Sequence, residues 1–344
     1  MKHYIIPVFI PHLGCPHACV FCNQAEITAV ERNARSIRGE DVLRIAKDHL
    51  ATIPPGDRVV ELSFFGGTFT GIPADLQREL LEAANHLLKE GSIQHIRCST
   101  RPDFIDETTL DRCVSFGMDI IELGVQSLDD EVLRQSGRGH DREAVRKASE
   151  LIRRKGIRLG HQIMPGLPGS SEESDLATAR ASIEMGPDEV RIYPTLVVEG
   201  TALADRYHGN SFQPLTLDEA VSRTSEIMAL YEAAEVTILR VGLQSTKEIS
   251  PEGSLIAGPW HPAFRELVLS CRLNEKIKKA ILDSTEEAEL IIHPRDLSVL
   301  YADKKRYFRQ HSDRSLRVLQ DEGTRRGEVL IRRKKGDLFN VLCI

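Results

Sequence analysis

Three cysteines within eight residues are the part of this sequence best suited to chemistry. Cys15, Cys19 and Cys22 follow the apolar run 4–10 in the spacing C-x3-C-x2-C. Three thiolates spaced in this way can bind three irons of a 4Fe–4S cluster and leave the fourth iron without a protein ligand. A small molecule can occupy that open position, so the pattern predicts a reactive cluster rather than an electron-transfer cluster.

Other metal sites are the alternatives. Structural zinc usually has four ligands in two paired knuckles, and the sequence holds no second C-x2-C. His12 or His17 could supply a fourth zinc ligand, so zinc stays open as an alternative. A ferredoxin-type cluster needs a fourth cysteine nearby, and the next one is Cys98. The spacing therefore favours the open 4Fe–4S site.

The cysteine loop resembles that of the radical S-adenosylmethionine (SAM) superfamily. The resemblance implies that SAM binds the open iron through its amino and carboxylate groups. One electron from the reduced cluster would then break the S–C5′ bond, and the resulting 5′-deoxyadenosyl radical would take a hydrogen atom from the substrate. In such enzymes the cofactors carry out the difficult step, while the protein positions them and excludes water.

The first two-thirds of the chain alternates between apolar strand patterns and amphipathic helix patterns, which is typical of a parallel α/β sheet with right-handed crossovers. We expect strands over 4–10, 59–65, 93–98, 118–124, 157–163 and 188–193. Helices are expected over 40–50, 74–89, 106–116, 128–136, 141–155 and 172–185.

Six strand–helix units suit the partial (β/α)6 barrel that the superfamily resemblance implies. A doubly wound open sheet fits the alternation equally well, and only the cysteine motif favours the barrel. In a barrel, functional residues gather at the C-terminal ends of the strands.

The pattern changes after Tyr193. A helix over 216–234 and a strand over 236–242 precede a loop rich in turn residues, and a small C-terminal α+β unit follows. In that unit we expect helices near 265–283 and 294–309 and strands near 288–292, 314–319 and 327–342. The expected division is a core barrel with its extension over 1–245, a connecting loop over 246–264 and the C-terminal unit over 265–344.

Charge is unevenly distributed along the chain. The net charge is −6, yet from residue 301 onward twelve Lys and Arg stand against six Asp and Glu. The basic residues are densest at 325–326 and 332–335. A basic end is compatible with a polyanionic partner such as RNA, and a solvated basic strand is the ordinary alternative.

Several residues at predicted strand ends match SAM-binding positions of the superfamily. By resemblance, Gly66, Gly67 and Thr68 approach the SAM ammonium, since glycines let the backbone come close to a ligand. A polar residue at the end of the fourth strand, Glu122 or Gln126, is the candidate for the ribose hydroxyls. An arginine placed like Arg138 pairs with the SAM carboxylate in similar proteins, and a surface arginine is the alternative. Gln162 is a further candidate, at the end of the fifth strand.

Other polar residues near the strand ends have an ordinary structural explanation. Arg101 precedes a Pro-Asp helix start, although its side chain could face the cavity and meet an anion. His161 and Gln162 lie on opposite faces of one strand, and we expect His161 to be a hydrogen-bonded core histidine. Lone cysteines are usually small buried hydrophobic residues, and only Cys98 is placed where it could face the cavity.

A larger set of motifs resembles the radical SAM half of the Elongator catalytic subunit, which modifies wobble uridine in tRNA. The matching segments are 10–17, 99–103, 124–127, 138–140, 163–169, 193–198 and 240–244. Members of that family continue into an acetyltransferase domain, for which these 344 residues leave too little room after the matching part. We therefore expect a short relative that cleaves SAM, and acetyl-CoA-dependent carboxymethylation is in doubt.

These observations predict a radical SAM enzyme, a transferase that acts on RNA, with tRNA as the expected substrate and the basic C-terminal unit as a phosphate contact. An external one-electron donor is required. The alternatives are an enzyme resembling oxygen-independent coproporphyrinogen oxidase that acts on a tetrapyrrole, and a non-catalytic Fe–S or zinc protein associated with RNA.

The expected location is the cytoplasm. The apolar start 4–10 is short and lacks a signal-peptide cleavage site, and no stretch reaches membrane-spanning length. The seven cysteines show no paired spacing outside the loop, which argues against a secreted disulfide framework.

Overall fold

The computed structural model describes residues 2–10, 13–16, 19–23, 37–243, 249–281, 288–311, 316–333 and 338–343. The chain divides into two compact units. The first comprises Met1–Thr216 and Ile227–Trp260, and the second comprises Leu217–Glu226 and His261–Ile344.

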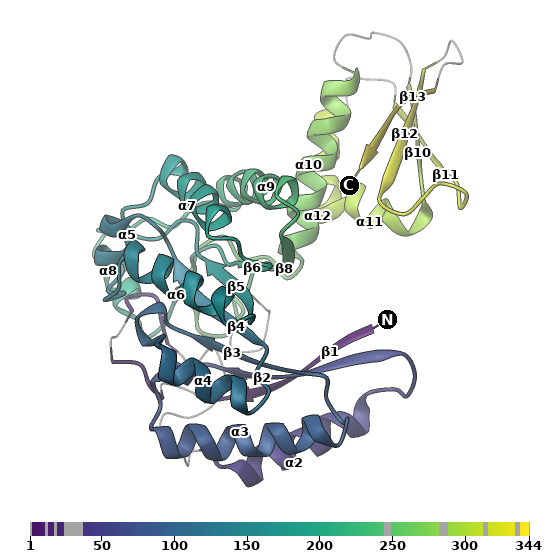
Figure 1. The fold of residues 1–344 in the computed structure, drawn as a ribbon. Coiled ribbons are helices and arrows are strands. Elements are labelled where there is room, and N and C mark those ends of the chain that lie inside the picture. The colour runs from purple at the N-terminus through teal and green to yellow at the C-terminus, as the bar shows by residue number, and fades with distance from the viewer. Residues whose placement is uncertain are drawn as a thin grey trace. The chain divides into compact units, whose positions relative to one another are not determined.

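Seven parallel strands form the sheet of the first unit (Figure 1). They are β1 (Lys2–Phe9), β2 (Arg58–Phe65), β3 (His95–Thr100), β4 (Ile120–Gln126), β5 (Arg158–Ile163), β6 (Glu189–Ile192) and β8 (Thr237–Val241). Each strand pairs with the next one in this list, so the strand order never reverses. A doubly wound sheet needs such a reversal, and that alternative is therefore wrong. The curled, open barrel is confirmed, with β8 as a seventh strand beyond the six predicted units.

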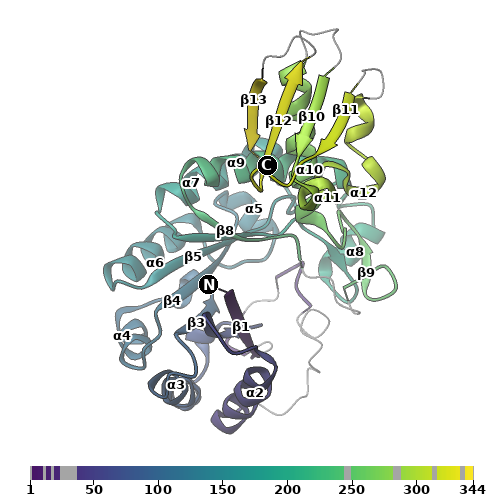
Figure 2. The ribbon, with the colours of Figure 1, turned by 90° about the vertical axis from the view of Figure 1, so that its right-hand side faces the viewer.

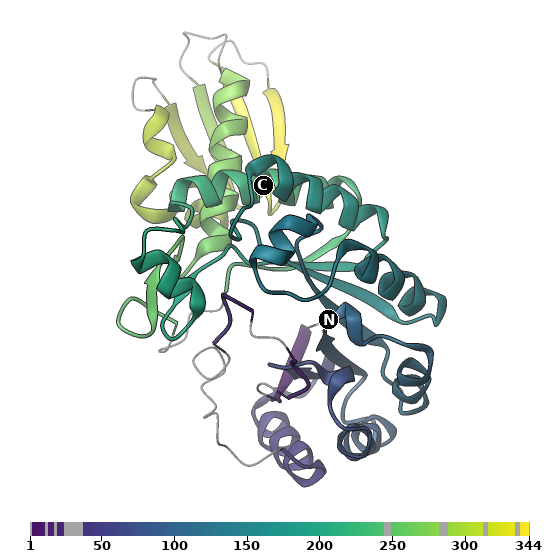
Figure 3. The same ribbon diagram turned by 90° about the vertical axis from the view of Figure 1, so that its left-hand side faces the viewer.

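Helices follow the strands and cover the outside of the curve. They are α2 (Gly39–Thr52), α3 (Ala74–Lys89), α4 (Glu107–Ser115), α5 (Asp130–Gln135), α6 (Arg142–Arg154) and α7 (Glu172–Glu184). The helix α9 (Leu217–Ala233) contributes residues 217–226 to the second unit and 227–233 to the first. Figure 2 shows α2, α3, α4 and α6 in a row along the outer side of the strands, and Figure 3 shows the same arrangement from the opposite side. The side chains of Asp106 and Asp141 accept hydrogen bonds from backbone N–H groups in the first turns of α4 and α6. Each such cap contributes about 1 kcal/mol to helix stability.

The two faces of the sheet differ in chemistry because side chains alternate along each strand. On β2, Val60, Leu62 and Phe64 face the helices and are almost fully buried. Glu61 and Ser63 alternate with them and face the inside of the curve. The helix side therefore forms the apolar core, and the inner side carries polar and charged groups.

Three short elements of the first unit were not predicted. The two-residue strand β7 (Val197–Val198) pairs antiparallel with β9 (Leu255–Ala257), and α8 (Ala202–His208) follows β7. Each is too short for its hydrophobic periodicity to be recognised in the sequence.

The second unit packs one long helix on a four-stranded sheet. It contains α10 (Phe264–Ile281) and the strands β10 (Ala288–Ile292), β11 (Leu316–Gln320), β12 (Glu328–Arg333) and β13 (Leu338–Cys343), in the order β11-β10-β12-β13. Leu273 and Ile277 of α10 are buried against Leu290, Ile292 and Ile331 of the sheet.

Two expectations for the second unit were wrong. The helix over 294–309 is a series of short pieces, including α11 (Leu297–Leu300) and α12 (Ala302–Lys305). Positive φ angles at Asp303 and Lys304 break it, because a right-handed helix cannot continue through left-handed residues. The strand over 327–342 is two antiparallel strands, β12 and β13.

In the part of the chain that the structure describes, every helix is too short or too polar to cross a membrane.

Candidate cofactor-binding site

The cysteine loop lies directly on the segment that follows β2. The backbone N–H of Ile10 donates to the carbonyl oxygen of Phe65 at 2.7 Å, and the N–H of Thr68 donates to that of Leu13 at 2.9 Å. A methyl group at Gly67 would lie 2.5 Å from the carbonyl oxygen of Ile10, and one at Gly14 would lie 2.3 Å from that of Thr68. Glycine is required at both positions because two backbone segments touch there. The structure thus gives Gly67 a role that the sequence did not reveal.

The thiols of Cys15 and Cys19 contact residues from other parts of the chain. The sulfur of Cys15 lies 3.1 Å from the hydroxyl oxygen of Thr68, and the sulfur of Cys19 accepts a hydrogen bond from Nη1 of Arg138 at 3.2 Å. The N–H of Cys22 donates to the carbonyl oxygen of Cys19 at 3.0 Å. All three cysteines are half-buried. The loop therefore presents its thiols at the C-terminal edge of the sheet.

Arg138 joins this loop to the end of β4. Its Nη2 donates to the carbonyl oxygen of Gly124 at 2.5 Å, and Arg101 donates to the carbonyl oxygen of Arg138. The Arg138 side chain is buried, and its Nε finds no hydrogen-bond acceptor among the described residues. A buried donor without an acceptor costs about 1–3 kcal/mol, which an anionic ligand at this point would recover.

Gln126 and Gln162 meet at the ends of β4 and β5. Nε2 of Gln162 donates to Oε1 of Gln126 at 3.2 Å. Gln126 has a φ of 65°, an uncommon left-handed conformation for a residue with a side chain. A Cβ at Gly124 would lie 3.0 Å from Nε2 of Gln126 and 3.2 Å from Nη2 of Arg138. The predicted residues Cys19, Arg138, Gln126 and Gln162 are thus gathered around Gly124.

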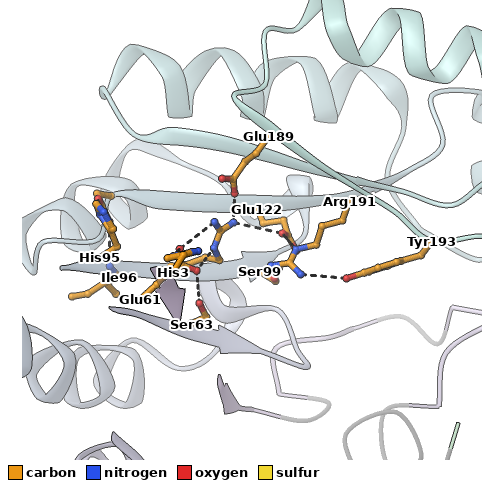
Figure 4. Close-up of polar contacts among 12 residues, drawn as sticks. His3, Glu61, Ser63, His95, Ile96, Ser99, Glu122, Glu189, Arg191 and Tyr193 are labelled. Carbon is orange, nitrogen blue, oxygen red and sulfur yellow. Dashed lines mark hydrogen bonds and ion pairs between the residues drawn. The ribbon is translucent and has the colours of Figure 1, made fainter. Parts of the chain in front are cut away.

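Glu122 lies deeper, in a buried ionic network on the inner face (Figure 4). One carboxylate oxygen accepts from the hydroxyl of Ser99 at 3.0 Å, and the other accepts from Nε of Arg191 at 2.6 Å. Arg97 bonds Glu61 through Nε at 2.5 Å and Glu189 through Nη1. Three carboxylates thus face two guanidinium groups in a layer that is almost fully buried.

The network changes the pKa values of its members. Burial alone would raise the pKa of Glu61, but hydrogen bonds from Arg97 and Ser63 outweigh burial and hold that pKa below its usual value. Burial alone would lower the pKa of Arg97, but Glu189 and Glu61 raise it. Glu61 can therefore stay ionised although it is buried, because a buried charge is tolerated when it is paired.

Of this network, the sequence patterns indicated only Glu122. The signal was present, since Glu61, Arg97, Glu189 and Arg191 each interrupt an apolar strand pattern. Strand alternation predicts that such residues share a face, but it does not predict which strand supplies each partner.

The structure decides three further expectations. His161 is confirmed as a core histidine, with Ser149 at 3.0 Å and Ser182 at 2.8 Å from its ring nitrogens. Arg101 forms a bidentate pair of hydrogen bonds with Asp103, so its guanidinium group already has an ionic partner.

The expectation that Cys98 could face the cavity is wrong. It alternates with Arg97 and Ser99 and lies on the helix side near Cys113, where burial raises its pKa well above the usual value.

The thiols and their surroundings fit a cluster bound by three cysteines. Three half-buried thiols stand in one loop, and a buried guanidinium with a free Nε reaches one of them. Among the described residues, no three His, Cys, Asp or Glu side chains are placed to hold one metal ion, and this includes the three loop thiols; the fit to a cluster rests on the number and chemistry of the thiols. His12 and His17, the candidates for a fourth zinc ligand, lie outside the described residues.

Several basic residues of the second unit are paired with carboxylates in the part of the chain that the structure describes. Arg332 bonds Glu289 through Nε at 2.8 Å, and Arg326 bonds Asp296 at 2.7 Å. Arg306 bonds Asp218 at 2.7 Å. This unit therefore presents less free positive charge than its composition suggests. Lys334 and Lys335 lie outside the described residues.

Comparison with known proteins places the chain in a family. A model of the radical SAM superfamily matches residues 9–181, and a model of the radical SAM C-terminal domain matches residues 187–274. This chain belongs to the radical SAM superfamily. The cofactors predicted from the cysteine loop, a 4Fe–4S cluster and SAM, are those of radical SAM enzymes.

Named relatives of this radical SAM chain support the resemblance to Elongator. It is 31% identical to a tRNA uridine(34) acetyltransferase of Dehalococcoides mccartyi, over 65% of this chain and 56% of that protein. Elongator complex protein 3 of Saccharomyces cerevisiae is 27% identical, over 64% of this chain and 47% of that protein. The chain thus spans about half the length of these relatives.

A shorter relative and a solved structure cover more of the radical SAM chain. An uncharacterised protein of Methanocaldococcus jannaschii is 27% identical, over 81% of this chain and 85% of that protein. The structure of Methanocaldococcus infernus Elp3 has a TM-score of 0.61 at 24% identity, over 80% of this chain and 63% of that one. The solved structure supports the fold.

Proposed function

We propose that this chain is a radical SAM enzyme that modifies RNA in the cytoplasm, with tRNA as its substrate. The observation that carries the proposal is the contact between Arg138 and Cys19, because it brings the cysteine loop to the ends of β4 and β5. The tRNA substrate is supported by the relatives named tRNA uridine(34) acetyltransferase.

When bound, the cluster, held by Cys15, Cys19 and Cys22, and SAM would supply one piece of chemistry: reductive cleavage of SAM with an electron from an external donor, followed by abstraction of a hydrogen atom from the substrate. The protein must hold the cluster, orient SAM and keep water away.

The loop residues hold the cysteines in place. Thr68 fixes Cys15 through its hydroxyl, and Arg138 fixes Cys19 through its guanidinium. Gly67 lets the loop lie directly on the backbone, because a side chain there would meet the carbonyl oxygens of Ile10 and Leu13, and Gly66 beside it has a φ of 87°. The same two glycines leave backbone carbonyl groups within reach of a ligand's ammonium group, the role assigned to Gly66, Gly67 and Thr68.

Arg138 is the proposed partner of the SAM carboxylate. Its guanidinium is fixed between Cys19 and Gly124, and its Nε has no acceptor among the described residues. A charge-assisted hydrogen bond from such a fixed donor contributes about 1.5–3 kcal/mol.

For the ribose hydroxyls, the geometry favours Gln126 and Gln162 over Glu122. Both carboxylate oxygens of Glu122 already accept hydrogen bonds, from Ser99 and Arg191. Gln126 and Gln162 lie nearer the C-terminal strand ends and can exchange their mutual hydrogen bond for bonds to hydroxyl groups. Glu122 then acts by holding the inner face together.

The ionic network acts as the inner lining of the barrel. Five charged side chains fill the space between β2 and β6 at the level of Arg97, and they exclude bulk water there. A radical formed above this layer would be shielded from solvent on that side.

The test is 5′-deoxyadenosine formation by anaerobically purified protein with a reconstituted cluster, given SAM and dithionite. Addition of bulk tRNA should raise the rate severalfold, while coproporphyrinogen III should not. Stimulation by the tetrapyrrole and not by tRNA would reject RNA as the substrate and favour the alternative.

A further inference from the structure

The segment that follows β6 holds the second half of the cysteine loop. The backbone N–H of Leu203, in α8, donates to the carbonyl oxygen of Val20 at 2.7 Å. Nδ2 of Asn23 donates to the carbonyl oxygen of Glu199 at 2.8 Å. Cys22 lies between these two loop residues in the sequence. Its backbone is therefore held on both sides by one segment of the chain.

Apolar side chains add to this contact. Val20 is buried in one cluster with Val197, Leu203 and Ala204, and Phe21 packs against the same cluster. Burial of apolar surface is the main favourable contribution to such a contact. The two residues that separate the last two cysteines of the loop are thus packed on β7 and α8.

Hydrogen bonds also join α8 and the loop to the turn that follows α5. The N–H of Val20 donates to the carbonyl oxygen of Ser136 at 3.0 Å, and Nη1 of Arg206, in α8, donates to that of Gln135 at 2.9 Å. Arg138 belongs to the same turn. Because α8 and this turn are bonded to each other as well as to the loop, neither can shift alone.

The turn between β7 and α8 is shaped to receive the Asn23 side chain. Gly200 has a φ of 70°, and a Cβ there would lie 2.9 Å from Nδ2 of Asn23. The hydroxyl of Thr201 donates to the carbonyl oxygen of Val198 at 2.7 Å and accepts from the N–H of Ala204 at 3.1 Å. The backbone that binds Asn23 is therefore itself fixed by local hydrogen bonds.

We propose that Asn23 and Leu203 are positioning residues for the 4Fe–4S cluster, because they fix the backbone that carries Cys22. They would act through the Cys22 thiol, since a cluster bound by three cysteines loses one of its ligands when one thiol moves away. This role would account for the motif 193–198 and the residues that follow it. The inference rests on the cofactors of radical SAM enzymes and not on the RNA substrate.

Each cysteine of the loop would then be held by a different part of the chain. The sulfur of Cys15 lies beside Thr68, and that of Cys19 accepts from Arg138. For Cys22, the contacts lie one residue after it and two residues before it. Three ligands held separately keep their spacing before the cluster binds.

The alternative is that the segment after β6 only stabilises the fold. Leu203 is fully buried, so its truncation lowers stability in either case. Asn23 is only half-buried, and its side chain forms the hydrogen bond to Glu199. A change at Asn23 can therefore separate an effect on the cluster from an effect on stability.

The experiment measures how fast the reconstituted cluster of the full chain is lost to an iron chelator under anaerobic conditions, from the fall in its visible absorbance. Asn23→Asp keeps the size of the side chain but replaces the donor by an oxygen that repels the carbonyl oxygen of Glu199. It should lose its cluster about fivefold faster than the wild type. The urea midpoint of the cluster-free protein should not change. Asn210→Asp, the same change at an exposed residue just after α8, should lose its cluster at the wild-type rate.

Leu203→Ala tests the apolar part of the contact. It should lose its cluster about tenfold faster than the wild type, and Leu203→Met, which keeps the volume, should restore a rate close to that of the wild type. Leu110→Ala is the matched control, because Leu110 is equally buried, on α4. Its urea midpoint should fall in a similar way, without faster loss of the cluster. If Leu203→Ala does not fold, Asn23→Asp decides alone.

Three outcomes would overturn the proposal. The first is a wild-type rate of cluster loss in Asn23→Asp. The second is equally fast loss in Leu203→Ala and Leu110→Ala, which would assign the effect to reduced stability. The third is a wild type that takes up no iron. Because no RNA is present in these measurements, their results do not depend on the proposed substrate.

Discussion

Nη1 of Arg138 donates to the sulfur of Cys19 at 3.2 Å, and 119 residues of chain separate the two. The other arm of the same guanidinium bonds the carbonyl oxygen of Gly124. One side chain thus connects the cysteine loop to the end of β4, where Gln126 and Gln162 meet. The position of the loop and that of the predicted SAM contacts are therefore set by a common residue.

Replacing Arg138 by Ala should weaken SAM binding by about 10- to 100-fold. The range corresponds to loss of one charge-assisted hydrogen bond, about 1.5–3 kcal/mol. Isothermal titration calorimetry of SAM into the cluster-loaded protein measures this change in SAM affinity. Arg134→Ala is the control, because Arg134 lies on the nearby α5 and its side chain is largely exposed. Equal SAM affinity in both variants would contradict the role of Arg138.

Replacing Gly67 by Ala should displace the cysteine loop. The added methyl group would lie 2.5 Å from one backbone oxygen and 2.7 Å from another, and neither can move without the loop. Iron content and cluster absorbance after reconstitution should both fall to less than half of the wild-type values. In Gly323→Ala the new methyl group would meet only the end of the Asp321 side chain, at 3.3 Å, so the cluster should be retained. A full cluster in Gly67→Ala would show that the loop does not need this contact.

Replacing Arg97 by Met should destabilise the protein by about 3–5 kcal/mol. Its removal leaves Glu61 and Glu189 as buried carboxylates without their main partner, and an uncompensated buried charge is costly. Urea denaturation at pH 7 gives the change in the free energy of unfolding. Arg146→Met removes a guanidinium from an exposed group of ion pairs on α6 and should change the stability little. Similar midpoints for the two variants would mean that the inner network does not stabilise the fold.

Strand alternation and the spacing of cysteines were enough to predict much of this architecture. The cysteine loop, the glycines at 66 and 67 and the order of the first six strands depend on local patterns. The pairing of Arg97 with Glu61 and Glu189 could not be predicted in this way, because each partner lies on a different strand. Cys98 was misplaced for a similar reason, since a shift of one residue in the strand exchanges its two faces.

The C-terminal unit shows a second limit of sequence patterns. Residues 294–309 have helical periodicity, but the left-handed backbone at Asp303 and Lys304 ends each piece early. Its basic residues suggested a free cationic surface, whereas Arg332 and Arg326 are paired with Glu289 and Asp296. Charge counts do not include such pairing.

The stability of the protein should decrease on acidification partly through His161. Burial lowers the pKa of His161 to about 3, whereas a histidine in an unfolded chain titrates near pH 6.5. Between these values the unfolded chain binds one more proton than the folded chain. The free energy of unfolding therefore falls as the pH falls, by about 1.4 kcal/mol per unit for this residue.

His161→Gln should remove this contribution, since glutamine can still bond Ser149 and Ser182 but does not titrate. Urea denaturation of both proteins at pH 7, 6 and 5 measures the difference. The difference in the free energy of unfolding between wild type and variant should become smaller as the pH falls. A difference that does not change with pH would mean that His161 stays accessible to protons.

The most direct test of the account compares 5′-deoxyadenosine formation in the wild type, Cys19→Ala and Cys98→Ala. Each protein is reconstituted anaerobically and given SAM, dithionite and tRNA. We predict tRNA-stimulated 5′-deoxyadenosine formation in the wild type and in Cys98→Ala, whose thiol is buried on the helix side, and none in Cys19→Ala. Equal production by all three proteins, or none by a wild type that carries a full 4Fe–4S cluster, would contradict it.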